Sequence, residues 1–243
     1  MKLLFTGASG FLGSNVRPLL EGMYGVKTVG LSPKDDYTID IAKEIPVLRE
    51  RYDIVLHVAG KAHSVPKTEA ERQVFFDVNL QGTKNLCTAL ERRRVPRAFI
   101  FISTVAVYGC AYGENITEDH PLDGDTPYAM SKRLAEEYLQ KWCYEHNVIL
   151  GIIRPSLIAG PNPPGNLGAM IHGIRSGKYL SIAGGQARKS VLMVQDIAKL
   201  VSLLAEKGGI YNVCDSHHPT FRELETTCLL YTSPSPRDMR RSR

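Results

Sequence analysis

The chain has 243 residues, of which 43% are hydrophobic and 23% charged, so it is long enough to bury one large globular core. Its apolar runs are too short to cross a bilayer, it opens on a strand-like segment and not on a signal peptide, and its five cysteines lack the close pairing of a metal site. We therefore expect a cytoplasmic protein with reduced thiols, no bound metal and no membrane partner.

The formal net charge of +5 is concentrated in segment 228–243, CLLYTSPSPRDMRRSR, where four Arg and one Asp carry +3. Because little excess basic charge remains upstream, we expect no nucleic-acid partner. Three interpretations of the segment are open: a flexible arm, a basic interaction tail, or the in-frame translation of a sequencing-library adapter, which CLLYTSPSPRD resembles. We favour the third, exclude the segment from the fold, and expect the natural chain to continue past about Thr227, so that this chain is truncated.

Apolar strand-like segments alternate with helical ones through most of the chain. Strands are expected at 1–7, 26–32, 53–60, 97–104, 148–156 and 209–215, and helices at 10–23, 45–52, 69–94, 128–147 and 194–208. Strands that are nearly uniformly apolar and separated by helices indicate a parallel sheet covered on both faces. The sequence therefore predicts an α/β fold, a doubly wound parallel sheet of the Rossmann type.

Segment 159–168, AGPNPPGNLG, interrupts this alternation, and a further helix and a short strand are expected between positions 169 and 190. Ligands of open parallel sheets bind at the carboxyl ends of the strands, so we expect the inserted segments to lie over those ends. We assign 1–158 to a dinucleotide-binding domain, to which 191–214 returns. Segments 159–190 and 215–227 would form a small, incomplete C-terminal substrate lobe, followed by the tail 228–243.

The motif TGASGFLG places Gly7, Gly10 and Gly13 between the first strand and the first helix. Glycine permits a tight turn and a close approach of the backbone to a pyrophosphate held at a helix N-terminus. A plain glycine turn is the alternative, but the position directly after the first strand favours a dinucleotide site. The other residues of this cofactor-binding loop are Ser9, Phe11 and Leu12.

The end of the second strand, VGLSPKDD, bears on the choice between NAD and NADP. In dinucleotide-binding folds an acid at this place holds the ribose 2′-hydroxyl, and the equivalent position falls near Ser32. Ser32 with the cation Lys34 suits a 2′-phosphate, whereas Asp35 or Asp36 would favour NAD. A solvated turn without a role in binding is the third interpretation, and of the two cofactors we favour NADP.

The motif YAMSK places Tyr128 and Lys132 four residues apart, on one face of a helix. A free tyrosine has a pKa of about 10, and a neighbouring ammonium lowers that pKa by favouring the phenolate. Such a pair can move a proton to or from a sugar hydroxyl while a nicotinamide exchanges a hydride. Ser103 and Thr104 add two hydroxyls at the end of an apolar strand, which argues against an ordinary surface helix.

Six motifs in order, TGASGFLG, HVAG, DVNLQGT, ISTVAVYG, PYAMSK and IRPSLIAGP, resemble the extended short-chain dehydrogenase/reductase family, in its NAD-dependent epimerase/dehydratase group acting on nucleotide sugars. The resemblance runs from Met1 to about Thr227. It implies an NAD or NADP cofactor, a UDP-sugar substrate and a homodimer. The dimer would be a four-helix bundle of the helices through 79–93 and from 128, with apolar contacts from Leu86, Leu90, Leu134 and Tyr138.

The resemblance also implies roles for individual residues. Thr104 would bind the 4-oxygen of the sugar, with Ser103 as a substitute, Tyr128 would be the acid/base, and Lys132 would bind the nicotinamide ribose. Further cofactor-binding positions would be Ser32, Asp40, Ile41, Ala59, Gly60, Asn79, Ser103, Pro155 and Ser156. Asn79 as a helix cap and Asp40 as an ordinary loop acid are the alternatives.

In the substrate lobe, Asn166 would contact the diphosphate, and Arg188 and Lys189 would supply cations for it. A solvated basic loop is the alternative interpretation of these three residues.

The 4,6-dehydratases of the family carry an acidic pair where this chain has Val105 and Ala106. Elimination of water needs an acid and a base, which these side chains cannot supply, so that activity is disfavoured. We expect a nucleotide-sugar 4-epimerase or 4-keto-sugar reductase of UDP-hexose or UDP-N-acetylhexosamine type, serving polysaccharide biosynthesis. The alternatives are a hydroxysteroid- or flavonoid-type reductase, which has no use for substrate-binding cations, and a non-catalytic cofactor-sensing regulator, which needs no Tyr/Lys pair.

Overall fold

A seven-stranded parallel sheet forms the body of the protein in a computed structural model that describes residues 1–62, 64–179 and 183–232. The strand order is β3-β2-β1-β4-β5-β6-β9, and every neighbouring pair is parallel. The strands are β1 (Lys2–Thr6), β2 (Gly25–Gly30), β3 (Tyr37–Thr38), β4 (Ile54–His57), β5 (Ala98–Ile102), β6 (Ile149–Pro155) and β9 (Gly209–Val213). The predicted doubly wound α/β fold is confirmed.

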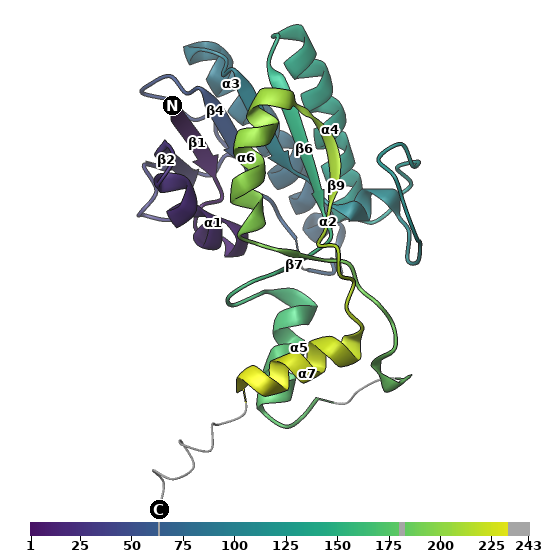
Figure 1. Ribbon diagram of the computed structural model, residues 1–243. Coiled ribbons are helices and arrows are strands. Elements are labelled where there is room, and N and C mark those ends of the chain that lie inside the picture. The colour runs from purple at the N-terminus through teal and green to yellow at the C-terminus, as the bar shows by residue number, and fades with distance from the viewer. Residues whose placement is uncertain (63, 180–182, 233–243) are drawn as a thin grey trace, which may run out of the picture.

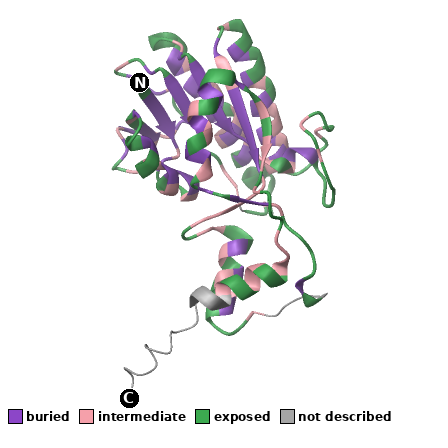
Figure 2. Ribbon diagram, viewed as in Figure 1, coloured by how far each residue is buried: buried purple, intermediate pink, exposed green. Residues whose placement is uncertain are grey.

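Helices cover both faces of this sheet (Figure 1). Helices α1 (Phe11–Glu21) and α6 (Asp196–Lys207) pack on one face, and α3 (Gly82–Arg93) and α4 (Pro127–Glu145) pack on the other. The central strands are buried on both sides, as Figure 2 shows, because their side chains alternate between the two apolar layers. Among the described residues, no helix is both long and apolar enough to cross a bilayer.

A smaller unit lies beyond the carboxyl ends of the strands, in the lower part of Figure 1. It consists of a two-stranded sheet, β7 (Leu157–Ala159) with β8 (Val191–Met193), a short turn η3 (Ala183–Gly185), and the helices α5 (Gly165–Arg175) and α7 (Phe221–Thr232). Leu167, Met170 and Ile174 of α5 pack against α7. Figure 2 shows far less buried surface here than in the large sheet, so this unit has only a small core of its own.

Three expectations from the sequence need correction or comment. Segment 45–52 is irregular and not helical: Pro46 has no amide hydrogen, and Leu48 and Tyr52 reach the core from an extended chain. The interval 169–190, in which a short strand was expected at no stated position, includes positions 180–182, which lie outside the described residues. Helix α7 runs to Thr232, so the first residues assigned to the tail 228–243 continue a helix, while 233–243 lie outside the described residues.

The predicted long helix 69–94 contains a turn of π-helix. It comprises α2 (Glu69–Phe76), the π-helical turn η1 (Asp77–Gln81) and α3. Such turns insert one residue into the helical ladder and redirect the side chains around them. Here the π-helical turn buries Asn79, which the candidate site uses.

A buried hydrogen-bond chain through His57 links β1, β4 and this helix. Thr6 Oγ1 accepts from the amides of Val58 and Ala59 and lies 2.6 Å from His57 Nδ1. His57 Nε2 lies 2.9 Å from Thr83 Oγ1, which donates to the carbonyl of Asn79. Because the Thr83 hydroxyl uses its proton on that carbonyl, it accepts from His57, so the bonding assigns the proton of the neutral ring to Nε2.

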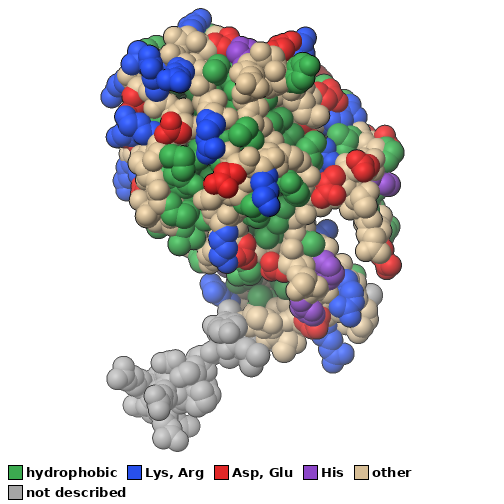
Figure 3. Space-filling model, turned by 45° about the horizontal axis from the view of Figure 1, so that its top comes forward, with side chains coloured by type: hydrophobic (Ala, Val, Ile, Leu, Met, Phe, Trp, Pro, Cys, Tyr) green, Lys and Arg blue, Asp and Glu red, His purple; other side chains and the backbone are tan. Residues whose placement is uncertain are grey.

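One ion pair among the described residues is fully buried, whereas the others lie at the surface. On the face in Figure 3, acidic and basic side chains are interspersed, apart from a group of Lys and Arg at the upper left. The buried pair joins Arg154 of β6 to Glu136 of α4 through two guanidinium nitrogens, with Nη2 2.6 Å from Oε2.

The same guanidinium also reaches the turn that follows β5. Arg154 Nη1 donates to Tyr108 Oη at 2.7 Å and to the carbonyl of Glu118 at 3.1 Å. Tyr108 in turn donates to Asn212 of β9. Tyr108 closes the 3-10 turn η2 (Val105–Tyr108), so one arginine ties together two strands, a helix and this turn.

The buried neutral state of His57 predicts a loss of stability in acid. Burial, and to a lesser degree the charge of Lys132, lowers the pKa of His57 to about 3. In the unfolded chain His57 binds a proton below its ordinary pKa of about 6.5, so the free energy of unfolding should fall as pH falls, by about 2 kcal/mol between about pH 6.5 and 5. Urea unfolding of the protein and of His57→Gln at these two pH values measures this. Equal pH dependence in both proteins would contradict the assignment.

Removing Arg154 should be costly because it leaves the carboxylate of Glu136 buried and unpaired. We expect Arg154→Met to lower the free energy of unfolding by about 3–5 kcal/mol, and the double variant Arg154→Met/Glu136→Met to recover most of that loss. Arg17→Met is the matched control: its partner Glu21 is exposed, so the change should cost less than about 1 kcal/mol. Chemical denaturation of the four proteins decides, and equal losses for Arg154→Met and Arg17→Met would refute the role given to the buried pair.

Candidate active site

The glycine loop between β1 and α1 brings the backbone into contacts that leave no room for side chains. Gly7 has a φ of +74°, and a Cβ there would lie 2.6 Å from the amide nitrogen of Ala59. A Cβ on Gly13 would lie 2.2 Å from the carbonyl oxygen of Gly7. Gly10 precedes α1 without a side-chain cap, so the first amides of that helix point to a site for an anionic group. Ser9, Phe11 and Leu12 complete the loop at this helix start.

Gly60, after β4, is likewise a position with little room for a side chain, because polar groups lie close to its backbone. A Cβ on Gly60 would lie 3.0 Å from Asn79 Oδ1 and 3.2 Å from Lys132 Nζ. Asn79 Oδ1 accepts from the amide of Lys61, and Nδ2 donates to the carbonyl of Lys61 and to Ser131 Oγ. The amide of Asn79 therefore holds the chain after Gly60 against α4, which is a positioning role.

The side chain of Lys132, which belongs to α4, is buried next to the end of β5. Its ammonium donates to the carbonyl of Ile102 at 2.8 Å and lies 4.5 Å from the ring centroid of Phe101. Burial lowers the pKa of Lys132 to about 8, while the carboxylate of Glu136, one turn further along α4, opposes this shift. The site thus keeps a buried cation that is still mostly protonated at neutral pH.

Tyr128 stands on the first turn of α4, which Thr126 caps by accepting from the amide of Ala129. Burial raises the pKa of Tyr128, and a hydrogen bond with Thr104 partly offsets this. The sequence led us to expect Lys132 to lower this pKa; in the structure the shift is upward, and the ammonium instead bonds to Ile102. Tyr128 is therefore a phenol at neutral pH.

Two serine hydroxyls that follow strand ends are buried and have no hydrogen-bond partner among the described residues. They are Ser103 Oγ, directly after β5, and Ser156 Oγ, directly after β6 and Pro155. An unpartnered buried hydroxyl is costly unless a ligand satisfies it. These orphaned atoms, the glycine cradle and the buried ammonium fit a nicotinamide dinucleotide lying across the carboxyl ends of the strands.

Val105 and Ala106 follow Thr104 in η2, and Ala106 donates its amide to Thr104 Oγ1 at 3.1 Å. These two side chains offer no acid or base to the site.

The positions expected to flank the adenosine lie around β3. Asp40 Oδ1 accepts from the amide of Ala42 and Asp40 pairs with Lys43, while Ile41 is buried. Ser32 Oγ accepts from the amide of Lys34, in the loop between β2 and β3. These contacts are local, so whether Ser32, Asp40 and Ile41 touch a cofactor stays a prediction, as it does for Ala59 beside the glycine loop.

The expected diphosphate ligands lie in the smaller unit. Asn166 is exposed on the first turn of α5, and Arg188 and Lys189 are exposed just before β8. Arg188 Nη1 donates to the carbonyl of His218, and the backbone amide of Lys189 donates to the carbonyl of Pro219. The structure thus brings Thr104, Tyr128 and Lys132 together. Of the expected diphosphate ligands, Arg188 and Lys189 share one segment before β8, and Asn166 lies apart from them in sequence on α5.

Sequence reasoning missed the supporting residues: His57, Ser131, Glu136 and Arg154. A signal existed for Glu136, which follows Lys132 by four residues and so shares its helix face. Nothing in the sequence shows that its partner comes from β6.

Comparison with known proteins finds relatives among epimerases, reductases and dehydratases of sugars joined to a diphosphate. The chain is 30% identical to the N-acetyl-alpha-D-glucosaminyl-diphospho-ditrans,octacis-undecaprenol 4-epimerase of Escherichia coli O157:H7, over 88% of this chain and 67% of that protein. It is 28% identical to the GDP-6-deoxy-D-mannose reductase of Pseudomonas aeruginosa, over 92% and 77%. It also matches the dTDP-D-glucose 4,6-dehydratase of Mus musculus, at 28% identity over 87% and 67%.

Solved structures of the same fold contain nicotinamide cofactors. The UDP-glucose 4-epimerase of Thermus thermophilus in complex with NAD superposes with a TM-score of 0.78 at 23% identity, over 97% of this chain and 85% of that one. RMD from Pseudomonas aeruginosa complexed with NADPH gives 0.79 at 26% identity, over 95% and 81%. Residues 3–214 match the model of the NAD dependent epimerase/dehydratase family. The chain therefore belongs to the NAD dependent epimerase/dehydratase family.

Proposed function

We propose that the protein is an NAD(P)-dependent nucleotide-sugar epimerase or 4-keto-sugar reductase that works at C4 of a UDP-hexose or UDP-N-acetylhexosamine. The observation that carries this proposal is the convergence of Thr104, Tyr128 and the buried Lys132 at the end of β5. The hydroxyls of Ser103 and Ser156, for which the described residues supply no hydrogen-bond partner, lie directly after β5 and β6. The relatives named above, a 4-epimerase and a sugar reductase, support the same reaction class.

The residues of this site can hold and move a proton at the sugar 4-oxygen. A bound nicotinamide would supply the hydride acceptor or donor at C4. Thr104 would hydrogen-bond the 4-oxygen, and Tyr128, whose raised pKa keeps it a phenol at neutral pH, would donate a proton to that oxygen as it gains charge. In the reverse direction the Tyr128 phenolate left by that donation would take the proton of the 4-hydroxyl and return to the phenol.

Val105 and Ala106 argue against a 4,6-dehydratase, although dehydratases are among the relatives. Elimination needs a proton donor for the leaving hydroxyl and a base for the carbon acid, next to the hydroxyl that binds the 4-oxygen. Val105 and Ala106 have hydrocarbon side chains, which can act neither as the acid nor as the base. The chemistry that this site supports is therefore reversible hydride transfer.

The smaller unit is proposed as the substrate lobe, with Asn166, Arg188 and Lys189 as ligands of the diphosphate. Arginine and lysine bind phosphoryl oxygens through charge-assisted hydrogen bonds. A diphosphate also joins sugar to lipid in the substrate named for the Escherichia coli relative, so a polyprenyl-diphosphate-linked sugar is the second substrate candidate. The domain limits given from the sequence stay predictions.

A homodimer through α3 and α4 is a further proposal. Leu86 and Leu90 are buried within the subunit, whereas Leu134 and Tyr138 are only partly buried and remain available for a partner. Sedimentation at micromolar concentration tests it, and a monomer would contradict it. The cytoplasmic location expected from the sequence also stays a prediction.

The proposed acid/base role predicts a large loss of activity in Tyr128→Phe. Its kcat should fall by about 10²–10⁴-fold with little change in KM, because proton transfer is lost while substrate contacts remain. The assay incubates the protein with UDP-glucose, UDP-galactose, UDP-N-acetylglucosamine and UDP-4-keto-6-deoxy sugars, with and without NADPH. Products are then separated by chromatography.

Tyr144→Phe, at an exposed position of the same helix, is the control and should keep full activity. Consumption of NADPH in proportion to product identifies a reductase, and interconversion without consumption identifies an epimerase. Full kcat in Tyr128→Phe would rule out the proposed acid, and no product from the whole panel would count against the substrate class.

A further inference from the structure

The end of β2 is where a dinucleotide-binding fold usually presents an acid to the adenosine ribose. That position lies about 20 residues after the glycine loop. In this protein β2 ends at Gly30, two residues earlier than the sequence suggested, and Gly30 has no side chain. The strand itself therefore supplies no carboxylate.

A carboxylate from the following loop occupies this place. A Cβ on Gly30 would lie 2.5 Å from Asp35 Oδ2 and 3.2 Å from its Cγ, so the Asp35 carboxylate fills the space where a side chain of residue 30 would begin. Asp35 is 8% exposed, and its Oδ2 accepts from the amide of Ser32 at 3.0 Å. No described residue donates to Oδ1, so this oxygen is free to accept from a ligand.

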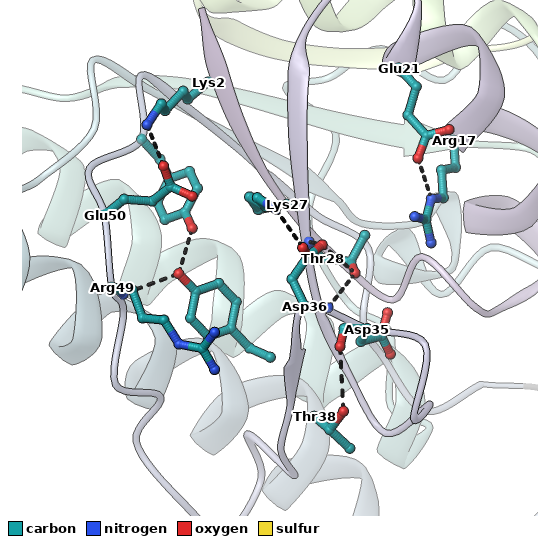
Figure 4. A network of polar contacts seen from close by, with 12 residues as sticks. Lys2, Arg17, Glu21, Lys27, Thr28, Asp35, Asp36, Thr38, Arg49 and Glu50 are labelled. Carbon is teal, nitrogen blue, oxygen red and sulfur yellow. Dashed lines mark hydrogen bonds and ion pairs between the residues drawn. The ribbon is translucent and has the colours of Figure 1, made fainter.

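The neighbouring Asp36 is engaged quite differently (Figure 4). It pairs with Lys27 at 2.7 Å and accepts from the amide and the hydroxyl of Thr28 at 3.0 and 3.2 Å. Figure 4 shows Asp36 turned toward Lys27 and Thr28, whereas Asp35 contacts Thr38 only through its backbone carbonyl, which leaves its carboxylate out of that contact. Asp36 therefore fastens the loop to β2, and only Asp35 presents a carboxylate at the strand end.

We infer that Asp35 replaces the missing strand-end acid, accepts a hydrogen bond from the ribose 2′-hydroxyl, and makes the protein prefer NAD to NADP. A 2′-phosphate would bring negative charge against a largely buried carboxylate, where repulsion is strong. Lys34 and Ser32, which favoured NADP from the sequence, weigh less here: Lys34 is exposed and its attraction is screened by salt, and Ser32 Oγ accepts from the amide of Lys34. The inference rests on the proposed NAD(P)-dependent function.

Titration calorimetry of NAD⁺ and NADP⁺ with the purified protein tests this without an activity assay. The unmodified protein should bind NAD⁺ more tightly. In Asp35→Asn the asparagine can still accept from Ser32 but carries no charge, and the affinity ratio of NAD⁺ to NADP⁺ should fall at least about tenfold. Asp36→Asn is the matched control in the same loop and should leave the ratio unchanged.

A rescue variant guards against a merely structural effect. Gly30→Asp combined with Asp35→Ala, which empties the space that the Asp35 carboxylate fills beside Gly30, returns the acid to the strand and should restore the preference for NAD⁺. If the unmodified protein binds NADP⁺ more tightly than NAD⁺, or if Asp35→Asn leaves the affinity ratio of NAD⁺ to NADP⁺ unchanged, the inference is overturned and the proposed function still stands. Failure of the unmodified protein to bind either nucleotide would instead overturn the proposed function, and this inference with it.

Discussion

The arrangement of the candidate site depends above all on the buried ion pair between Arg154 and Glu136. Neither charge would be tolerable in this interior alone, so each fixes the position of the other. Glu136 is one helical turn from Lys132, and Arg154 also holds Tyr108, which ends the turn that begins after Thr104. One guanidinium therefore fixes the helix that carries the proposed acid/base relative to the turn capped by Thr104, the residue proposed to bind the 4-oxygen of the sugar.

A second constraint is the buried ammonium of Lys132, which restricts the residues that can lie next to it. Gly60 is a glycine because a Cβ would approach both Lys132 and Asn79, and the π-helical turn brings Asn79 to the backbone of Lys61. His57 connects the same helix to the strand that precedes the glycine loop. The glycine loop proposed to bind the cofactor and the residues proposed to transfer the proton are thus parts of one hydrogen-bonded interior, which holds them in fixed positions.

Much of this could be predicted from sequence because the signals are local. Apolar strands with helical spacing between them predict the sheet, and Tyr128 and Lys132 share a helix face by their spacing alone. The partners of buried polar groups could not be predicted, since Arg154 and Glu136, or His57 and Thr83, meet only after the chain has folded. The predicted direction of the Tyr128 pKa shift was wrong for the same reason. Burial is a property of the folded state, and its effect on this pKa outweighs that of the Lys132 charge suggested by the motif. Segment 45–52 misled us because its apolar positions have helical spacing but Pro46 interrupts the backbone bonding.

The most direct test of the central claim, reversible hydride transfer at this site, is rapid mixing of the NAD⁺-saturated protein with UDP-sugars while the absorbance of reduced nicotinamide is recorded. The account predicts that reduced nicotinamide forms within the first turnover with at least one UDP-hexose or UDP-N-acetylhexosamine that has a free 4-hydroxyl. If calorimetry shows that the nucleotide and the UDP-sugars bind, yet no member of the panel reduces the nicotinamide, the account is contradicted.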